Sequence, residues 1–410
     1  MLSTRAATAL YVGAVLGPGV LLIPSLAAEA AGPASIIAWA ALLLLSIPLA
    51  ITFAALGVRF PEAGGTASYA RAAFGPRTAA VTGWWFLAGV VIGAPAVALI
   101  GGFYIADLLG AGRTGAVAGA GVMIAVVIAA NLGGVRTTAR LQLAFTGLLA
   151  ALLVVAVVTA LPESRSEHWT PFAPHGWAAV GTAASLLMFS FIGWEAVSHL
   201  AGELRDPRRQ LPRAIFAALV VVVLLYLGLA VATLGVLGSG APSSVPLADL
   251  MEAGLGAPGR TITAVLAVML TVGTMNAYVA AAVQLAGALA REGASSPRLG
   301  RRGSALGGLG AISAALLALL ATGVLGTEDL VHASGAAFVA VYVSASAAGV
   351  RLLRGTARWA AGSAFAAVVV VFAFAGAFLA VPAAIGVAVL VATRRLPARG
   401  AHAAPCPAAG

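Results

Sequence analysis

The chain contains no lysine, so all 23 of its basic residues are arginines. Without lysine there can be no Walker-A phosphate loop and no Schiff base to a cofactor, which excludes a single-chain ATP-driven pump. The one cysteine, Cys406, lies near the end of the chain, where it can form no internal disulfide and has no metal-site spacing. Charged residues make up only 9% of the sequence. We therefore expect no redox chemistry and no resident metal or cofactor.

Apolar residues are abundant instead. They account for 61% of the 410 residues, and the mean hydropathy is +1.04. A soluble domain with a polar surface does not have this composition, so the sequence predicts an all-α integral membrane protein whose surroundings are the lipid bilayer. The net charge is +10, but the arginines are mostly scattered between long apolar runs rather than gathered on one face. Nucleic acid is therefore not an expected partner.

Apolar stretches of roughly 17 to 25 residues are long enough to cross a bilayer. About twelve are found, at residues 7–30, 34–57, 79–102, 115–131, 141–161, 177–200, 213–237, 260–289, 306–326, 330–350, 358–375 and 378–394. The last two are short, with the segment AFAGAF around Gly376 to turn the chain between them. Residues 397–410 are predicted to form a disordered tail.

The arginines also predict an orientation, because short cytoplasmic loops collect basic residues. With both termini in the cytoplasm, 20 arginines fall on the inner side. The outer side then holds only Arg113, Arg165 and Arg260. This division supports an even number of spans, and we expect a multi-pass protein of the plasma membrane.

Two predicted spans contain helix-breaking residues. The first includes VLGPGVLLIP at residues 15–24, with Pro18 between two glycines, and the sixth is interrupted from Ser190 to Gly193. A broken helix in lipid leaves backbone groups without partners, which is tolerable only inside protein or beside a cavity. Breaks five spans apart have opposite orientations, as in transporters built from inverted five-helix repeats.

The predicted architecture is thus a single domain over residues 1–410. Repeat one covers about 7–161, repeat two about 177–350, and two extra helices about 358–394. An exposed helix amino end attracts an anion and a carbonyl end attracts a cation, so the paired breaks suit a zwitterion. We assign two other glycine pairs, GVVIG at 89–93 and GAVAG at 115–119, to helix packing.

Glu195 is the only acidic residue in the middle of a predicted span, two residues after the second break. A carboxylate there is unfavourable unless it is protonated, paired or hydrated, so its default interpretation is functional. It reads as an isolated carboxylate beside Ile192 and Trp194, and we expect it to couple substrate movement to protons. The alternative is a purely structural role, in which it bonds to backbone groups freed by the first break.

The segments LGPGVLLIPSLAAEAAG and FSFIGWEAVSHLAGELRDPRRQLPRA resemble spans one and six of the amino acid–polyamine–organocation superfamily, whose members have the LeuT-like fold. The segments RFPEAGGTASYARAAFG, TGWWFLAG and TMNAYVAAAVQLAGALAR resemble the bacterial branch that exports methionine and branched-chain amino acids. The resemblance implies a LeuT-like 5+5 inverted repeat with discontinuous helices one and six.

The same resemblance implies a set of site residues. The backbone of the first break would hold the substrate carboxylate, and carbonyls of the second break would hold the ammonium group. Phe189 is either a gate over the substrate or plain core, and Asn276 either lines the site or bonds helix to helix. The implied substrate-binding set is Leu16, Gly17, Pro18, Gly19, Phe189, Ser190, Ile192, Gly193, Asn276 and Tyr278.

Small residues dominate the first half of each broken helix, and Glu195 is the only acid nearby, which favours a neutral apolar substrate. The predicted function is secondary active transport of methionine, leucine, isoleucine and valine, by proton antiport or exchange and in the direction of efflux. The alternatives are uptake by proton symport, or a polyamine or metal-ion transporter of the same fold. Relatives that use sodium carry hydroxyl residues late in span eight, where this chain has Ala280, Ala281, Ala282 and Val283.

Residues after the second break have two interpretations. Glu195, His199 and Glu203 follow at i, i+4 and i+8 along one helix face and could hold a divalent metal. Metal transporters of this fold carry Asp in the first break and Met in the sixth span, whereas the breaks here read Gly-Pro-Gly and Phe-Ser-Phe. We therefore favour Glu195 and His199 for proton coupling, with Glu203 and Arg208 as a cytoplasmic gate. An enzyme would need a nucleophile with a His–carboxylate pair beside it, and the spans show none, so we do not expect an enzyme. The sequence does not indicate an oligomeric state.

Overall fold

The computed structural model describes residues 3–60, 65–134, 139–195, 204, 207–238 and 243–394 of the chain. Within these ranges the regular elements are helices. Nine described segments are long and apolar enough to cross a membrane, and shorter apolar helices lie at Ala178–Phe191 and Gly376–Ala392. The chain is thus a multi-pass all-α membrane protein, as its composition predicted.

Every predicted span contains a helix. The first half of the bundle consists of α1 (Thr4–Val15), η1 (Pro18–Leu21), α2 (Ile23–Ala31), α3 (Ser35–Arg59), α5 (Pro76–Leu109), α6 (Gly112–Leu132) and α7 (Ala139–Ala160). The second half consists of α8 (Ala178–Leu187), η5 (Met188–Phe191), α10 (Pro207–Ala232), α12 (Ala257–Arg291), α13 (Arg302–Ala321) and α14 (Thr327–Leu352). The last two spans are α15 (Gly355–Ala373) and α16 (Ala380–Ala392), and the turn predicted at Gly376 begins the short helix η8 (Gly376–Leu379).

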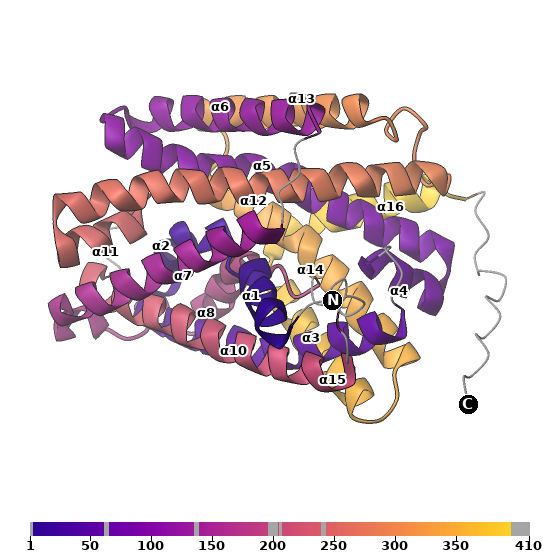
Figure 1. Ribbon diagram of the computed structural model, residues 1–410, viewed down its shortest axis with the longest axis horizontal. Coiled ribbons are helices and arrows are strands. Elements are labelled where there is room, and N and C mark those ends of the chain that lie inside the picture. The colour runs from indigo at the N-terminus through magenta and orange to yellow at the C-terminus, as the bar shows by residue number, and fades with distance from the viewer. Residues whose placement is uncertain are drawn as a thin grey trace.

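Two short α-helices in the described part of the chain were not predicted. These are α4 (Gly65–Phe74), between spans two and three, and α11 (Pro246–Leu255), between spans seven and eight. Figure 1 shows α11 and α4 at opposite ends of the bundle. Both are too short to cross a membrane, so a search for long apolar runs misses them.

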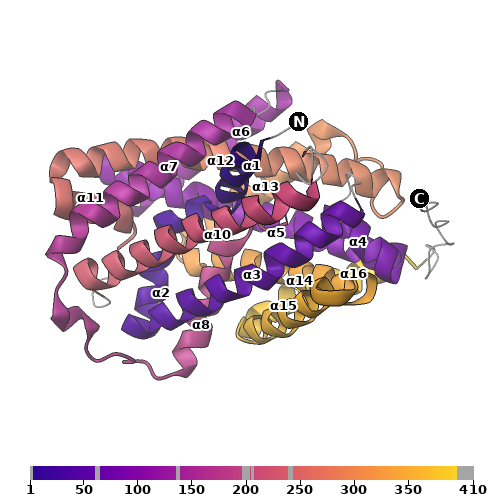
Figure 2. The ribbon, with the colours of Figure 1, turned by 60° about the horizontal axis from the view of Figure 1, so that its bottom comes forward.

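The bundle has a buried centre and a lipid-facing rim. In the most apolar part of each helix, 78% of α14 and 67% of α5 is buried, against 17% of α15. Helix α5 packs against α6, α12 and α14, and it lies between α6 and α14 in both ribbon views (Figures 1 and 2). The glycines and alanines of these central helices allow the close approach that packing in lipid requires.

The broken helices lie inside this bundle. Helix α1 packs against α7 and α10, and α2 packs against α8. The short helix η1 contacts η5, α5 and α12. The two predicted breaks, which are about 170 residues apart in the sequence, therefore meet at one place with α5 and α12 beside them.

An ionic cluster ties α11 to the end of the bundle that the arginine pattern predicts to be extracellular. The guanidinium of Arg260, in the first turn of α12, contacts Asp107 of α5 at 2.5 Å. It also contacts Asp249 at 2.7 Å and Glu252 at 2.5 Å, both on α11. One arginine thereby joins three helices and holds α11 against α5 and α12.

Candidate functional site

The first break separates α1 from η1. Helix α1 ends at Val15, the Leu16 amide donates to the Val12 carbonyl at 2.7 Å, and Gly17 then adopts an extended conformation. Pro18 has no amide hydrogen, and the Gly19 amide has no hydrogen-bond partner in the described part of the chain. The amino end of η1 therefore presents a free amide and the positive end of a peptide dipole.

The second break follows η5. Ile192 is extended and Gly193 has a φ of +135°, a conformation that side-chain-bearing residues rarely adopt. The Tyr226 hydroxyl of α10 lies 2.7 Å from the Ser190 carbonyl and 2.9 Å from the Val15 carbonyl of the first break. A hydroxyl carries one proton, so the two breaks share a single donor and one carbonyl always retains acceptor capacity.

The two breaks are in direct contact, and glycine permits it. A methyl group added to Gly19 would lie 2.7 Å from Ser190 Oγ and 3.3 Å from the Phe189 ring. A methyl group on Gly193 would lie 2.0 Å from the carbonyl oxygen of Ala14. These distances are shorter than van der Waals contact, so the positive end of one half-helix and the carbonyl end of the other approach closely only because both positions lack a Cβ.

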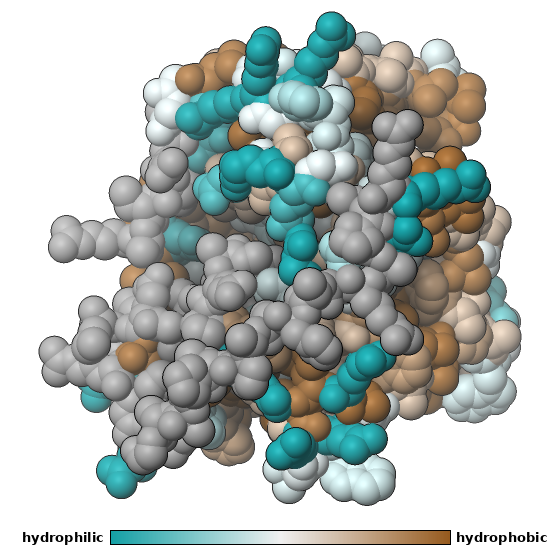
Figure 3. Space-filling model, turned by 90° about the vertical axis from the view of Figure 1, so that its right-hand side faces the viewer, coloured by the Kyte–Doolittle hydropathy of each residue, from teal (hydrophilic) through white to brown (hydrophobic). Residues whose placement is uncertain are grey.

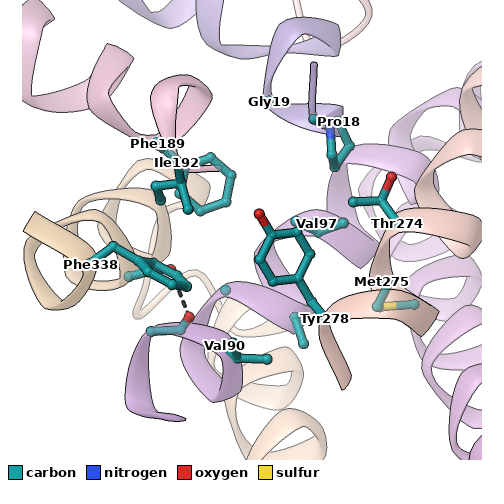
Figure 4. Close-up of a pocket in the computed structure, with 15 residues that line it drawn as sticks. Pro18, Gly19, Val90, Val97, Phe189, Ile192, Thr274, Met275, Tyr278 and Phe338 are labelled. Atoms are coloured by element: carbon teal, nitrogen blue, oxygen red, sulfur yellow. Dashed lines mark hydrogen bonds between the residues drawn. The ribbon is translucent and has the colours of Figure 1, made fainter. Parts of the chain in front are cut away.

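A small cavity opens beside this contact. Figure 4 shows the Tyr278 side chain directed into it, with Phe189, Ile192 and Phe338 on one side and Pro18 and Thr274 on the other. Its walls carry no charged side chain. The lining residues are Gly17, Pro18, Gly19, Gly89, Val90, Gly93, Ala94, Val97, Phe189, Ile192, Thr274, Met275, Tyr278, Ser334 and Phe338.

The polar groups of the cavity are few. Thr274, Tyr278 and Ser334 supply hydroxyls, and the Ser334 hydroxyl already donates to the Gly89 carbonyl at 2.8 Å. With no fixed charge in the lining, the backbone ends at the two breaks are the strongest electrostatic features of the cavity. The cavity can therefore hold an apolar side chain while the breaks hold opposite charges.

Glu195 lies behind the second break and is 7% exposed. Its carboxylate accepts a hydrogen bond from the Gly193 amide at 2.9 Å and contacts the Tyr342 hydroxyl of α14 at 2.5 Å. The same hydroxyl lies 3.0 Å from the Gly193 amide, and Phe53 of α3 packs edge-on against the Tyr342 ring. The prediction of an isolated carboxylate is wrong, because a residue in span ten, distant in the sequence, supplies the partner.

A family model described as amino acid permease matches residues 2–399. The chain belongs to this family. It is 34% identical to the uncharacterized amino acid permease YecA of Bacillus subtilis, over 93% of this chain and 92% of that protein. It is 32% identical to the L-methionine/branched-chain amino acid exporter YjeH of Escherichia coli, over 84% of each. The branched-chain amino acid permease BcaP of B. subtilis is 28% identical over 56% of this chain and 53% of its own length.

A solved structure confirms the fold of this amino acid permease. MhsT in complex with L-phenylalanine matches 92% of this chain and 99% of its own, with a TM-score of 0.63 and 17% identity. At that identity the likeness shows the fold alone. The predicted LeuT-like architecture with discontinuous helices one and six is confirmed.

The predicted site residues of the permease fall into three groups. The cavity is lined by Gly17, Pro18, Gly19, Phe189, Ile192 and Tyr278. Leu16, Ser190 and Gly193 are buried in the breaks behind the cavity wall. Asn276 does not line the cavity, and its Oδ1 accepts a hydrogen bond from Asn131 of α6 at 2.8 Å, so the structure supplies the helix-to-helix bond that was one of its two interpretations.

Some predictions fall outside the described part of the permease. These are His199, Glu203 and the Arg208 side chain, together with the tail at 397–410. Among the described residues, no three His, Cys, Asp or Glu side chains are grouped to hold a metal ion. The part of His199 in proton coupling and the cytoplasmic gate at Glu203 and Arg208 therefore remain predictions, as does our preference for them over a metal site at residues 195–203.

The cavity wall formed by α5 and α14 was not predicted from the sequence. Gly89 and Gly93, which were predicted to serve helix packing, both line the cavity and pack closely. A methyl group added to Gly89 would lie 2.7 Å from Phe338, and one added to Gly93 would lie 2.7 Å from Ser334. The paired small residues were a valid signal of close approach. What approaches them is a side chain from span ten, which the local pattern does not reveal.

Proposed function

We propose that this permease exports neutral apolar L-amino acids, namely methionine, leucine, isoleucine and valine, by proton antiport or exchange. The observation that carries the proposal is the uncharged cavity between two helix breaks. A polyamine or metal ion would lack a carboxylate partner in the lining, and an unpaired charge in such a site is strongly unfavourable. An apolar side chain has no such requirement.

The α-carboxylate and α-ammonium groups of the substrate would bind at the breaks. The free amide of Gly19, at the amino end of η1, would hold the carboxylate, and Leu16, Gly17 and Pro18 would form the break that exposes this amide. The carbonyls of η5 and Ile192 would take the ammonium group, with Tyr226 sharing its one proton between the breaks. Phe189 lines the cavity and faces Gly19, which fits a residue that closes over bound substrate.

Proton coupling is assigned to Glu195, with His199 on the path toward the cytoplasm. Glu195 accepts from the Gly193 amide, so a change in its protonation acts directly on the backbone of the second break. Its contact with Tyr342 extends that effect to α14, which also lines the cavity through Ser334 and Phe338. The carboxyl is thus placed to link proton occupancy to substrate binding.

Export is supported by the relative named as a methionine and branched-chain exporter. The relative named as a branched-chain permease keeps uptake by proton symport as the second candidate. Overexpression in a bacterial host separates them. We expect resistance to toxic analogues of leucine and methionine and lower internal pools of these amino acids, whereas an uptake permease would increase sensitivity and raise the pools.

We further propose that the permease lies in the plasma membrane with both termini in the cytoplasm, from the arginine pattern. Cysteine accessibility tests this on a Cys406→Ser background, which leaves no other cysteine in the chain. A Ser304→Cys variant, exposed at the start of α13, should react with a membrane-impermeant thiol reagent only in opened cells. Labelling of intact cells from outside would contradict the orientation.

A further inference from the structure

Three helices end together at the side of the bundle that the arginine pattern predicts to be cytoplasmic. Helix α3 ends at Arg59, α14 ends at Leu352, and α15 begins at Gly355 and packs against both. The connecting segment reads RLLRGTARW over residues 351–359 and contains no acidic residue. We call Arg59, Arg351, Arg354, Arg358 and Trp359 the basic corner.

The arginines of the basic corner are exposed and have no carboxylate partner among the described residues. Arg59 donates to the Leu352 carbonyl, and the Arg351 guanidinium lies 5.7 Å from the centre of the Phe74 ring. These contacts hold two guanidinium groups in place without neutralising them. Four positive charges are therefore gathered at one corner, and their guanidinium groups have N–H donors that remain available to a ligand.

Trp359 places this corner at the level of the membrane surface. It is 82% exposed and lies in the second turn of α15, whose most apolar part is only 17% buried, so α15 faces lipid. Val370 lies about three turns further along the same face of α15 and is 59% exposed, as expected for contact with acyl chains. A tryptophan at the end of such a face belongs at the headgroup level, where its ring is apolar and its N–H is hydrated.

We propose that the basic corner is a binding site for an anionic phospholipid headgroup. The guanidinium groups match the phosphodiester in charge and geometry, and Trp359 and the exposed face of α15 contact the acyl region. Figure 3, which views the right-hand side of the molecule as drawn in Figure 1, shows hydrophilic side chains projecting between brown apolar surfaces. A lipid satisfies both kinds of surface, whereas a soluble anion satisfies only the charges.

The test uses the full-length purified protein in a neutral detergent, with the melting temperature measured against added phosphatidylglycerol or phosphatidylcholine. We expect phosphatidylglycerol to raise the melting temperature at much lower concentration. The triple variant Arg351→Gln, Arg354→Gln, Arg358→Gln should need about 100-fold more phosphatidylglycerol, because each arginine near an anionic surface contributes about fivefold. The matched control removes the same charge from exposed residues elsewhere on this side, by Arg298→Gln, Arg301→Gln, Arg302→Gln, and should respond like the unmodified protein.

Three results would overturn the proposal. An equal loss of the phosphatidylglycerol response in both triple variants would show general attraction to a basic surface. Equal stabilisation by phosphatidylcholine would show that the site does not distinguish the charge of the headgroup. Equal stabilisation by soluble glycerol phosphate would show a phosphate site rather than a lipid site. Should the triple variant fail to fold, the single change Arg358→Gln is expected to weaken the phosphatidylglycerol response by about fivefold, and an unchanged response would reject the proposal.

Discussion

Replacing Gly193 with alanine is expected to abolish transport and lower the melting temperature of the protein. The new methyl group would lie 2.0 Å from the Ala14 carbonyl, which is backbone and cannot rotate away. The φ of +135° adds strain of about 1 to 3 kcal/mol for a side-chain-bearing residue, and overpacking adds about as much again. The change would separate the two breaks whose contact forms the site.

The matched control for this variant is Gly147→Ala in α7, where an added methyl group has no other atom within 4 Å. This control should transport like the unmodified protein and melt at or slightly above its melting temperature, because alanine is favoured over glycine within a helix. Measurement of the melting temperature and of vesicle transport checks both variants. If Gly193→Ala transported at a normal rate, the two breaks would not need the contact seen in the structure.

The second large effect is expected from Glu195→Gln. Glutamine has nearly the same shape as glutamic acid and can still accept from the Gly193 amide, but it cannot gain or lose a proton. We expect the variant to bind and exchange substrate while its flux loses its dependence on pH. This expectation rests on the proposed proton coupling and on the contacts of the Glu195 carboxyl with the second break and with Tyr342.

Flux through reconstituted vesicles, measured from mildly acidic to mildly alkaline pH, tests this expectation. Glu163→Gln, at an exposed position between spans five and six, is the control and should keep the normal pH profile. An unchanged pH profile in Glu195→Gln would assign this carboxyl a structural role, that of holding Gly193 and Tyr342 together.

Local sequence chemistry was sufficient to predict the spans and both helix breaks. Long apolar runs predict membrane helices because a bilayer leaves few other ways to satisfy the backbone, and Gly17-Pro18-Gly19 interrupts one for reasons contained in three residues. The helices α4 and α11 escaped prediction because they are too short for a hydropathy search. The fold could thus be predicted wherever the signal lay within one helix.

The site was predicted only in part, because much of its wall comes from α5, α12 and α14, which are distant in the sequence from the breaks. Nothing near Glu195 in the sequence indicates Tyr342, and nothing near Asn276 indicates Asn131. A small residue such as Gly93 looks the same in the sequence whether it packs against a helix or borders a cavity. In the structure Gly93 does both, because it contacts Ser334 of α14 and also lines the cavity. Such residues are assigned only when the helices are placed in space.

The most direct test of the central proposal is substrate counterflow in proteoliposomes. Vesicles containing the purified protein would be loaded with unlabelled leucine and mixed with labelled leucine, methionine, isoleucine, valine, arginine or a polyamine, with protein-free vesicles as the control. A neutral cavity between two oppositely polarised helix ends predicts saturable exchange of the four apolar amino acids and none of the cations. Exchange of arginine or the polyamine without exchange of leucine would contradict it.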